Sequence, residues 1–154
     1  SYLNKLVPIG YFGNGVEGIF FRHTVVTNAK NIERETDDCV SISLDIQDEL
    51  KDNFNYKSGQ YLTFRMFFKG NDVRRSYSLC SSPLDNEWKV AVKEIENGQF
   101  SSYANRSLKV GDILEVMPPM GNFTIKADLN TKQNIVSFAS GSGITPILSF
   151  IKTV

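Results

Sequence analysis

This chain has few of the cysteine and histidine residues that metal sites and disulfide frameworks need. Its 154 residues include two cysteines, Cys39 and Cys80, and one histidine, His23. Two cysteines cannot build a disulfide framework, and they fall short of the four thiolates that hold an iron–sulfur cluster. A zinc site made of cysteine and histidine is disfavoured for the same reason. The sequence therefore predicts no metal centre, and we expect reduced cysteines.

Excess charge and long apolar runs are also lacking. The 17 basic residues balance the 17 acidic ones, so no global field attracts nucleic acid or an anionic membrane. The longest apolar runs, such as residues 135–139, are far shorter than the about 20 residues that a membrane-spanning helix needs. No leader of charged and then apolar residues opens the sequence. These absences predict a soluble, cytoplasmic protein without a nucleic-acid or membrane partner.

What the chain does have is a period-two alternation of apolar and polar residues, from about residue 25 to residue 125. The alternation is cleanest in residues 40–46, which predicts a strand with one buried face. Further strands are predicted at residues 60–68, 73–80, 87–96 and 112–117. The turn-forming residues 69–72 join two of them into a hairpin. Five or six short strands at this spacing favour a small closed barrel.

One helix interrupts the strands. It follows the turn at residues 97–100, and Ser101 or Ser102 is placed to cap it. The helix is expected to continue through Asn105.

Past Phe123 the pattern changes. Residues 134–139 are apolar without alternation, which is typical of a strand covered on both faces. A glycine-rich turn then leads to Thr145 as N-cap and Pro146 at the first helical position. This is the opening of a βαβ unit, so we expect a second domain that is truncated at Val154.

Three short motifs could hold a ligand. Arg75 and Tyr77, two residues apart on a predicted strand, point to the same face and combine a planar cation with a flat ring. That pair suits a nucleotide-like cofactor, although a solvated arginine beside a tyrosine that caps the barrel explains it equally well. Residues 98–102 form a glycine turn at a helix start, which can bind phosphate. Residues 141–146 form a glycine-rich strand-to-helix turn, the kind that cradles a dinucleotide pyrophosphate.

These motifs occur in a familiar order. The set is Arg75-Ser76-Tyr77-Ser78, Val92-Lys93, residues 98–102, residues 119–123 and residues 141–146. In this order and spacing the chain resembles the ferredoxin–NADP reductase-type oxidoreductases. Among these it is most similar to the reductase component of phenylacetyl-CoA epoxidase systems.

The resemblance implies a mainly β fold. A six-stranded antiparallel Greek-key barrel with a short capping helix would bind FAD over residues 24–127. Residues 132–154 would be the first strand and partial helix of a truncated α/β domain for NADH or NADPH. Residues 1–23 remain unassigned. Asn97 stands where the family has a glycine, and asparagine tolerates the left-handed backbone that glycine supplies.

The resemblance also implies roles for individual residues. Arg75 would contact the FAD pyrophosphate, Tyr77 would stack on the isoalloxazine ring, and Ser78 would hydrogen-bond near the flavin N5 that accepts hydride. Tyr77 and Ser78 are therefore the candidate catalytic residues. Val92 and Lys93 would offer backbone groups to the pyrimidine edge of the flavin. The remaining candidate cofactor-binding residues are Gly98, Phe100, Ser101 and Ser102 in the diphosphate cradle, and Thr145 near the flavin and nicotinamide.

We therefore interpret the chain as the FAD-binding domain of an NAD(P)H-dependent oxidoreductase, and we expect this chain to be inactive by itself. Electrons would pass from nicotinamide through flavin to a ferredoxin-type 2Fe–2S acceptor. The alternatives are a reductase domain that serves a haem or free-flavin acceptor, and a non-catalytic barrel that acts as an interaction module. The apolar face of the partial helix should be uncovered and could drive self-association. That face consists of Ile147, Leu148, Phe150 and Ile151.

Overall fold

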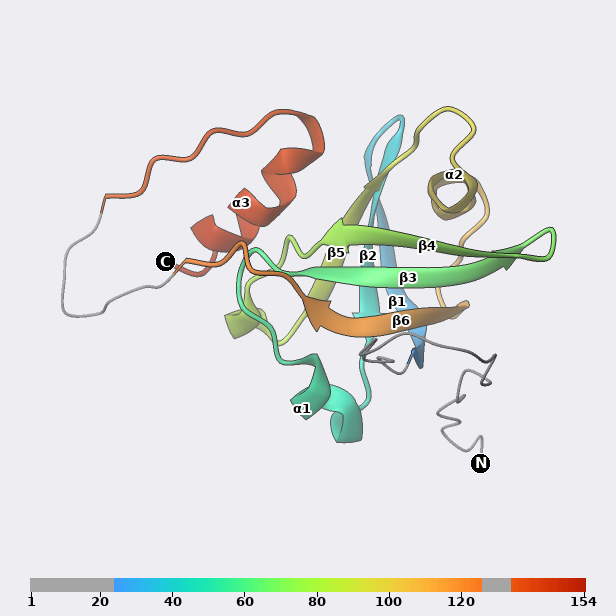
Figure 1. Cartoon of the computed structure of the whole chain (residues 1–154), viewed down its shortest axis with the longest axis horizontal. Coiled ribbons are helices and arrows are strands. Elements are labelled where there is room, and N and C mark those ends of the chain that lie inside the picture. The colour runs from blue at the N-terminus through green and yellow to red at the C-terminus, as the bar shows by residue number, and fades with distance from the viewer. Residues whose placement is uncertain (1–23, 126–133) are drawn as a thin grey trace, which may run out of the picture.

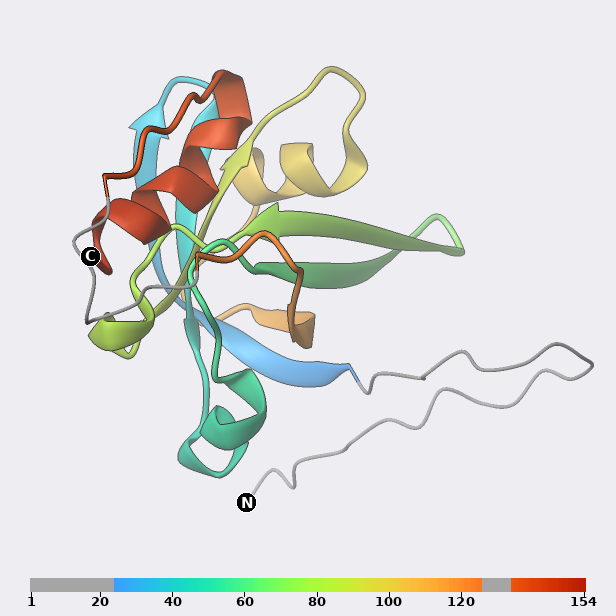
Figure 2. The ribbon, with the colours of Figure 1, turned by 60° about the vertical axis from the view of Figure 1, so that its left-hand side comes forward.

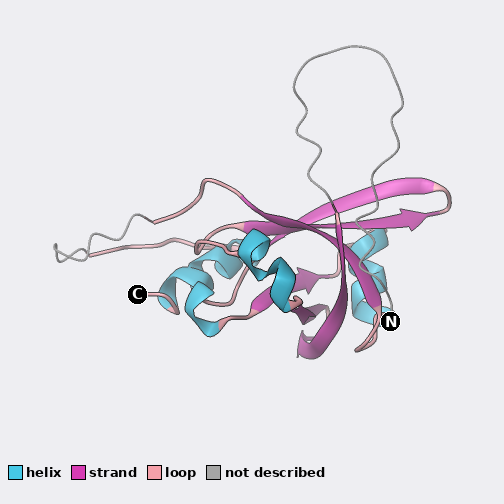
Figure 3. Ribbon diagram, turned by 90° about the horizontal axis from the view of Figure 1, so that it is seen from below, coloured by secondary structure: helices cyan, strands magenta, loops and turns pink. Residues whose placement is uncertain are grey.

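The computed structural model describes residues 24–125 and 134–154 (Figure 1), so the unassigned segment with His23 lies outside it. Six antiparallel strands form one sheet: β1 (Val25–Thr36), β2 (Cys39–Asp45), β3 (Tyr61–Phe68), β4 (Asn71–Ser78), β5 (Trp88–Lys93) and β6 (Ile113–Met120). Three α-helices accompany them: α1 (Lys51–Phe54), α2 (Gln99–Arg106) and α3 (Ile144–Ile151). Seen from below, the helices lie around the strands (Figure 3). Among the residues so described, no helix is long and apolar enough to cross a membrane.

The strands close into a barrel. Their order in the sheet is β4-β3-β6-β1-β2-β5, so β4 and β5 are its two edges. A bridge between Leu79 and Val90 joins these edges, and the Cys80 N–H donates to the Lys89 carbonyl at 2.8 Å. The six-stranded antiparallel barrel predicted from the sequence is thereby confirmed.

The interior of the barrel is apolar. Its largest fully buried side chains include those of Phe64, Ile42 and Val116, from three different strands. Helix α1 covers one end of the barrel through Phe54, which is fully buried. The Trp88 indole N–H donates to the Phe54 carbonyl at 2.7 Å, so the buried nitrogen has a partner and α1 is held in place. The sequence did not predict α1, because it is only one turn long.

Strand β2 is buried on both faces, although its alternation predicts only one buried face. Ser41 and Ser43, on the polar side, are 1% and 3% exposed. Lys89 lies opposite Ser43 in the register and reaches Glu33 at 2.8 Å, so its aliphatic stem crosses this outer face. Alternation shows which residues face the core, but it does not show what covers the other side.

The predicted hairpin is confirmed, and its turn is tighter than expected. Lys69 and Gly70 both have positive φ, 49° and 80°, as a two-residue hairpin turn requires. Strand β4 therefore begins at Asn71, before the predicted start at Val73. The hairpin extends beyond the rest of the barrel (Figure 1).

Both predicted helices are present, but their predicted caps are wrong. Helix α2 has Gly98 as its N-cap, and the Ser101 hydroxyl lies in the first turn, where it accepts from the Ile95 N–H at 3.3 Å. Ser102 is also inside α2. Helix α3 begins at Ile144 after a 3-10 turn, and the Thr145 hydroxyl donates to the Ser142 carbonyl at 2.8 Å. In each case the hydroxyl hydrogen-bonds to a backbone group of the preceding loop, and it does not cap the N–H groups at the start of the helix.

The predicted strand at residues 134–139 is not formed. This segment has no regular secondary structure, and Phe138 is 93% exposed. A strand needs a neighbouring backbone to pair with. The six strands of the described chain pair with one another, and residues 134–139 pair with none of them.

Helix α3 lies against the barrel (Figure 2), which corrects the prediction that its apolar face is uncovered. Ile147 and Phe150 are buried, at 9% and 5% exposure. The Phe150 ring packs on Phe123, with ring centroids 5.3 Å apart. Of the four residues predicted to be uncovered, only Leu148 and Ile151 remain exposed.

Hydroxyl groups fasten α3 to two loops of the barrel. The Ser149 hydroxyl donates to the Ser81 carbonyl at 2.6 Å. Past the helix, the Thr153 hydroxyl lies 2.7 Å from that of Ser58 and 3.1 Å from that of Ser82. No sequence pattern indicates this arrangement, because serine and threonine are common in solvated loops.

Gly59 lies in a barrel loop that closely approaches Phe123 and the Phe150 ring of α3. Its φ is 89°, and a Cβ there would overlap the Phe123 carbonyl and the Phe150 ring. We expect Gly59→Ala to lower the free energy of unfolding by about 3 kcal/mol, through backbone strain together with overpacking. Gly70→Ala is the matched control, because its φ is 80° but nothing lies within 4 Å of the new methyl group. It should lose only the strain, about 1 kcal/mol. Urea unfolding followed by Trp88 fluorescence compares the two, and equal losses would contradict the close approach.

Cys80 should make stability fall at alkaline pH. Its thiol donates to the Lys89 carbonyl at 3.4 Å, and burial raises its pKa from an ordinary 9.0 to about 11. The unfolded chain therefore loses this proton first, and stability should fall by roughly 2–3 kcal/mol between pH 9 and 11. Cys80→Ala should flatten that part of the stability curve. Cys39→Ala, at a half-buried thiol, is the control with the smaller expected effect. Identical curves for wild type and Cys80→Ala would refute the prediction.

Candidate cofactor-binding site

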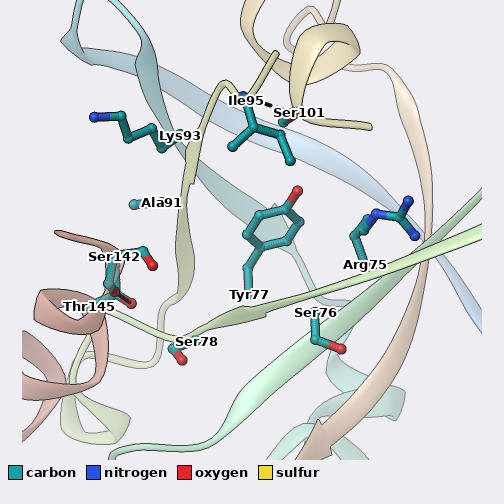
Figure 4. A pocket seen from close by; sticks show the side chains of 10 residues that line it. All are labelled: Arg75, Ser76, Tyr77, Ser78, Ala91, Lys93, Ile95, Ser101, Ser142 and Thr145. Carbon is teal, nitrogen blue, oxygen red and sulfur yellow. Dashed lines mark hydrogen bonds between the residues drawn. The ribbon is translucent and has the colours of Figure 1, made fainter. Parts of the chain in front are cut away.

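A cleft of about 370 Å³ opens where β4 meets β5, below the start of α2 and beside the start of α3 (Figure 4). Six of the predicted site residues line it: Arg75, Tyr77, Ser78, Lys93, Ser101 and Thr145. Four others are not part of the lining: Val92, Gly98, Phe100 and Ser102. The structure thus brings together residues from four separate elements that the sequence places up to 70 positions apart.

Arg75 offers a cation without a counter-charge. Its guanidinium donates to the Arg74 carbonyl at 2.7 Å and forms no ion pair within residues 24–125 and 134–154. The neighbouring Arg74 points to the other face of the strand, where it pairs with Asp72 at 3.0 Å. Arg75 therefore keeps most of its donors available for an anion.

Tyr77 projects into the middle of the cleft (Figure 4). Its ring packs on that of Phe100, with centroids 5.6 Å apart and planes 35° from parallel, and on the edge of Phe64 at 5.9 Å. Burial raises the pKa of the Tyr77 phenol, and the Arg75 charge lowers it to a smaller extent. The ring is thus neutral and held in place from behind by core aromatics.

The Phe100 ring supports Tyr77 from the core side. Its side chain is 1% exposed, behind Tyr77 and within the core. Phe100 can therefore reach a ligand only through its backbone, while its ring fixes the position of Tyr77. No feature of the motif itself distinguishes these two possibilities.

The turn before α2 is tightly packed and uses a left-handed backbone. Asn97 has a φ of 59°, which confirms that asparagine adopts the left-handed backbone here. A Cβ at Gly98 would overlap the Ser101 hydroxyl and the Ile95 side chain. No side chain caps α2, so the N–H groups of residues 99–101 have no acceptor within the helix, whereas the Ser102 N–H donates to the Gly98 carbonyl at 3.0 Å.

Strand β5 supplies the second wall. Ala91 and Lys93 face the cleft, whereas Val92 between them is fully buried in the core. Lys93 pairs with Asp38 at 3.2 Å across an exposed surface. Val92 can therefore contribute only backbone groups, as the resemblance implied.

The start of α3 forms the wall opposite Arg75 (Figure 4). Thr145 and Ser142 lie there, and the Thr145 hydroxyl is already bonded to the Ser142 carbonyl. Four lining residues were not predicted: Ser76, Ala91, Ile95 and Ser142. The alternation of β5 places Ala91 beside Lys93 and could have identified it, but Ile95 and Ser142 depend on how loops fold over the barrel.

These features suit one kind of ligand. An unpaired guanidinium and free helix N–H groups attract phosphate oxygens. A half-buried phenol ring between them and α3 offers a face on which a flat ring system can stack. The cleft volume is within the range of small-molecule sites. The arrangement favours a molecule that joins phosphates to an aromatic ring.

Comparisons with known proteins agree with this geometry. The chain matches the family of oxidoreductase FAD-binding domains over residues 25–125. It is 41% identical over 122 residues to a component of the 1,2-phenylacetyl-CoA epoxidase of Escherichia coli K12, covering 79% of this chain and 34% of that protein. It is 43% identical over 96 residues to a flavohemoprotein of Candida albicans, covering 61% and 24%.

A solved structure is similar in fold. Phthalate dioxygenase reductase, described as a modular structure for electron transfer from pyridine nucleotides to 2Fe–2S, superposes with a TM-score of 0.65 at 29% identity. The match covers 84% of this chain and 39% of the reductase. The chain thus spans 24% to 39% of the length of these relatives. Since the family match takes in more than half of the chain, this protein belongs to the oxidoreductase FAD-binding domains of the ferredoxin reductase type.

Proposed function

We propose that the cleft between β4 and β5 holds FAD, and that the chain is the flavin-binding unit of an NAD(P)H-dependent oxidoreductase. The observation that carries this proposal is the pairing of Arg75 with Tyr77. Arg75 supplies a cation without a counter-charge, and Tyr77 supplies a ring that packs on Phe100. Both residues line the same cleft. In this assignment Arg75 binds the pyrophosphate, and Tyr77 stacks on the isoalloxazine ring.

Three further groups complete the proposed site. Ser78, at the end of β4, would place its hydroxyl near flavin N5. The backbones of Val92 and Lys93 would face the pyrimidine edge. The first turn of α2 would hold the second half of the diphosphate through the N–H groups of residues 99–101, because those of Gly98 and Ser102 already donate to the Ile95 and Gly98 carbonyls. Gly98 fits this role because a side chain there would fill the turn.

FAD, when bound, supplies the redox chemistry: it accepts a hydride and passes on electrons singly. The residues of this chain bind it and set its orientation. Tyr77 is neutral over the physiological pH range, since burial raises its pKa, and so adds no charge beside the ring. The proposal therefore assigns no general acid or base to the described residues.

We further propose that residues 132–154 begin the nicotinamide-binding region. Thr145 and Ser142 face the cleft from the side opposite Arg75, which leaves the stacking face of Tyr77 between them. A nicotinamide ring delivered from that side would meet the flavin near Thr145.

A ferredoxin-type 2Fe–2S centre is the proposed electron acceptor. The likeness to phthalate dioxygenase reductase supports this choice, because that protein is described as passing electrons to 2Fe–2S. A haem acceptor is the second candidate, and the likeness to a flavohemoprotein favours it. The two candidates share every feature of the flavin site.

FAD titration of the purified chain tests the site. We expect saturable quenching of flavin fluorescence, and a Kd that rises about 10- to 100-fold in Arg75→Ala, the effect of losing hydrogen bonds to a charged group. Arg74→Ala is the matched control, because its guanidinium is paired with Asp72 on the other face. Its Kd should match that of wild type. An Arg75→Ala variant with unchanged affinity, or a wild-type chain that binds no FAD, would instead favour the interaction-module interpretation.

Electron transfer separates the two acceptors. The FAD-loaded chain, reduced by light under anaerobic conditions, would be mixed in a stopped-flow instrument with a 2Fe–2S ferredoxin or with a haem protein of the same potential. We expect faster oxidation of the flavin by the ferredoxin. Faster oxidation by the haem protein would reverse the choice of acceptor and leave the FAD site unaffected.

A further inference from the structure

Asn105 sits in the last turn of α2 and has an unusual set of partners. Its side chain is buried, with the residue 6% exposed. The amide nitrogen donates to two backbone carbonyls, those of Val92 on β5 and Ser101 on α2, both at 2.9 Å. Asparagine is a poor residue for a helix interior because its amide competes with the backbone. Here the amide instead joins the helix to the neighbouring strand.

Arg34 holds the other side of the same amide. One guanidinium nitrogen donates to Asn105 Oδ1 at 3.0 Å, and another donates to the Asn105 backbone carbonyl at 2.6 Å. Arg34 also makes a longer contact with the Asp37 carbonyl, at 3.5 Å. It forms no ion pair within the part of the chain that the structure describes. Since guanidinium only donates, it fixes which end of the amide faces the two carbonyls.

The two carbonyls that accept from the Asn105 amide belong to two different walls of the cleft. Val92 lies between Ala91 and Lys93, which line the β5 wall. Ser101 lines the α2 wall, and its hydroxyl accepts from the Ile95 N–H. The Asn105 amide therefore sets the distance between β5 and the first turn of α2. That turn lies a full helical turn away from Asn105, so the amide itself is remote from the cleft.

From this geometry we propose that Asn105, oriented by Arg34, is a positioning residue for the diphosphate half of the FAD site. It acts through the backbones of Val92 and Ser101 and does not touch the cofactor. The inference rests on the proposed function, because only a phosphate group at the first turn of α2 would sense the spacing. Arg75 and Tyr77 belong to β4, so the flavin half of the site does not depend on this amide in the same way.

Comparison of FAD with FMN tests the proposal, because FMN lacks the second phosphate. Asn105→Asp is isosteric and still accepts from Arg34, but it cannot donate to the two carbonyls. We expect its Kd for FAD to rise about tenfold, the loss of one charge-assisted contact, while its Kd for FMN stays within about twofold. Equal weakening of both ligands, or an unchanged Kd for FAD, would overturn the positioning role.

Two controls exclude a general effect on the helix. Arg106→Ala changes the next residue of α2, which is paired with Glu94 at 2.7 Å, and should leave both affinities unchanged. Ala104→Gly weakens the same helix without removing the amide, so it should lower the melting temperature while keeping the ratio of the two Kd values. A shift of that ratio in Ala104→Gly would show that stability alone accounts for the effect.

A second variant covers the case in which Asn105→Asp does not fold. Arg34 is exposed, and Arg34→Lys removes the two-pronged contact without creating a buried cavity. We expect the Kd for FAD to rise about threefold with FMN unaffected. An unchanged ratio of FAD to FMN affinity in this variant would also overturn the proposal.

One measurement needs no cofactor. In the wild-type chain alone, both side-chain amide protons of Asn105 should exchange slowly with solvent, as measured by NMR. Fast exchange would show that the Asn105 amide does not hold the Val92 and Ser101 carbonyls. If the wild-type chain fails to bind FAD, the proposed function fails, while slow exchange of the Asn105 amide protons can still be observed. If it binds FAD with an unchanged ratio in the variants, only the positioning role fails.

Discussion

The cleft exists because the barrel closes between its two edge strands. In the sheet order β4 and β5 lie at opposite ends, and short contacts next to β4 join them: the Leu79–Val90 bridge and the hydrogen bond from Cys80 to Lys89. Closure sets Arg75 and Tyr77 on one wall opposite Lys93 on the other. Beyond this seam the two strands diverge, and α2 lies at the resulting opening. The β4 and β5 walls of the site are therefore as stable as the barrel itself.

Much of this arrangement could be predicted from the sequence, for identifiable reasons. Alternation located five of the six strands because one face of each is buried, although β1 was not placed, and the two-residue spacing of Arg75 and Tyr77 put them on one face. Three errors had a common origin. They concern the outer face of β2, the unpaired segment 134–139 and the buried Phe150. Each depends on which distant segment covers it, and a local sequence pattern does not indicate such contacts.

The supporting residues of the site were harder to predict than those that line it. Phe100 was predicted to belong to the diphosphate cradle, and nothing in that motif indicates that its ring lies in the core and packs on Tyr77. Asn105 carries no signal of its role, since an asparagine in a polar helix is ordinary on its own. Both act through tertiary contacts made by α2 with strands that come earlier in the chain. Residues of this kind become visible only when strand order and helix placement are known.

The attachment of α3 has a consequence for how the molecule responds to its surroundings. Its polar contacts with the barrel are made by hydroxyl and carbonyl groups of Ser149, Thr153 and Ser81, without a charged pair among them. Dissolved ions screen interactions between charges, but they leave neutral hydrogen bonds and buried aromatic contacts nearly unaffected. The seating of α3 on the barrel is accordingly independent of ionic strength. The internal geometry between Thr145 and Tyr77 should therefore stay constant as the salt concentration changes.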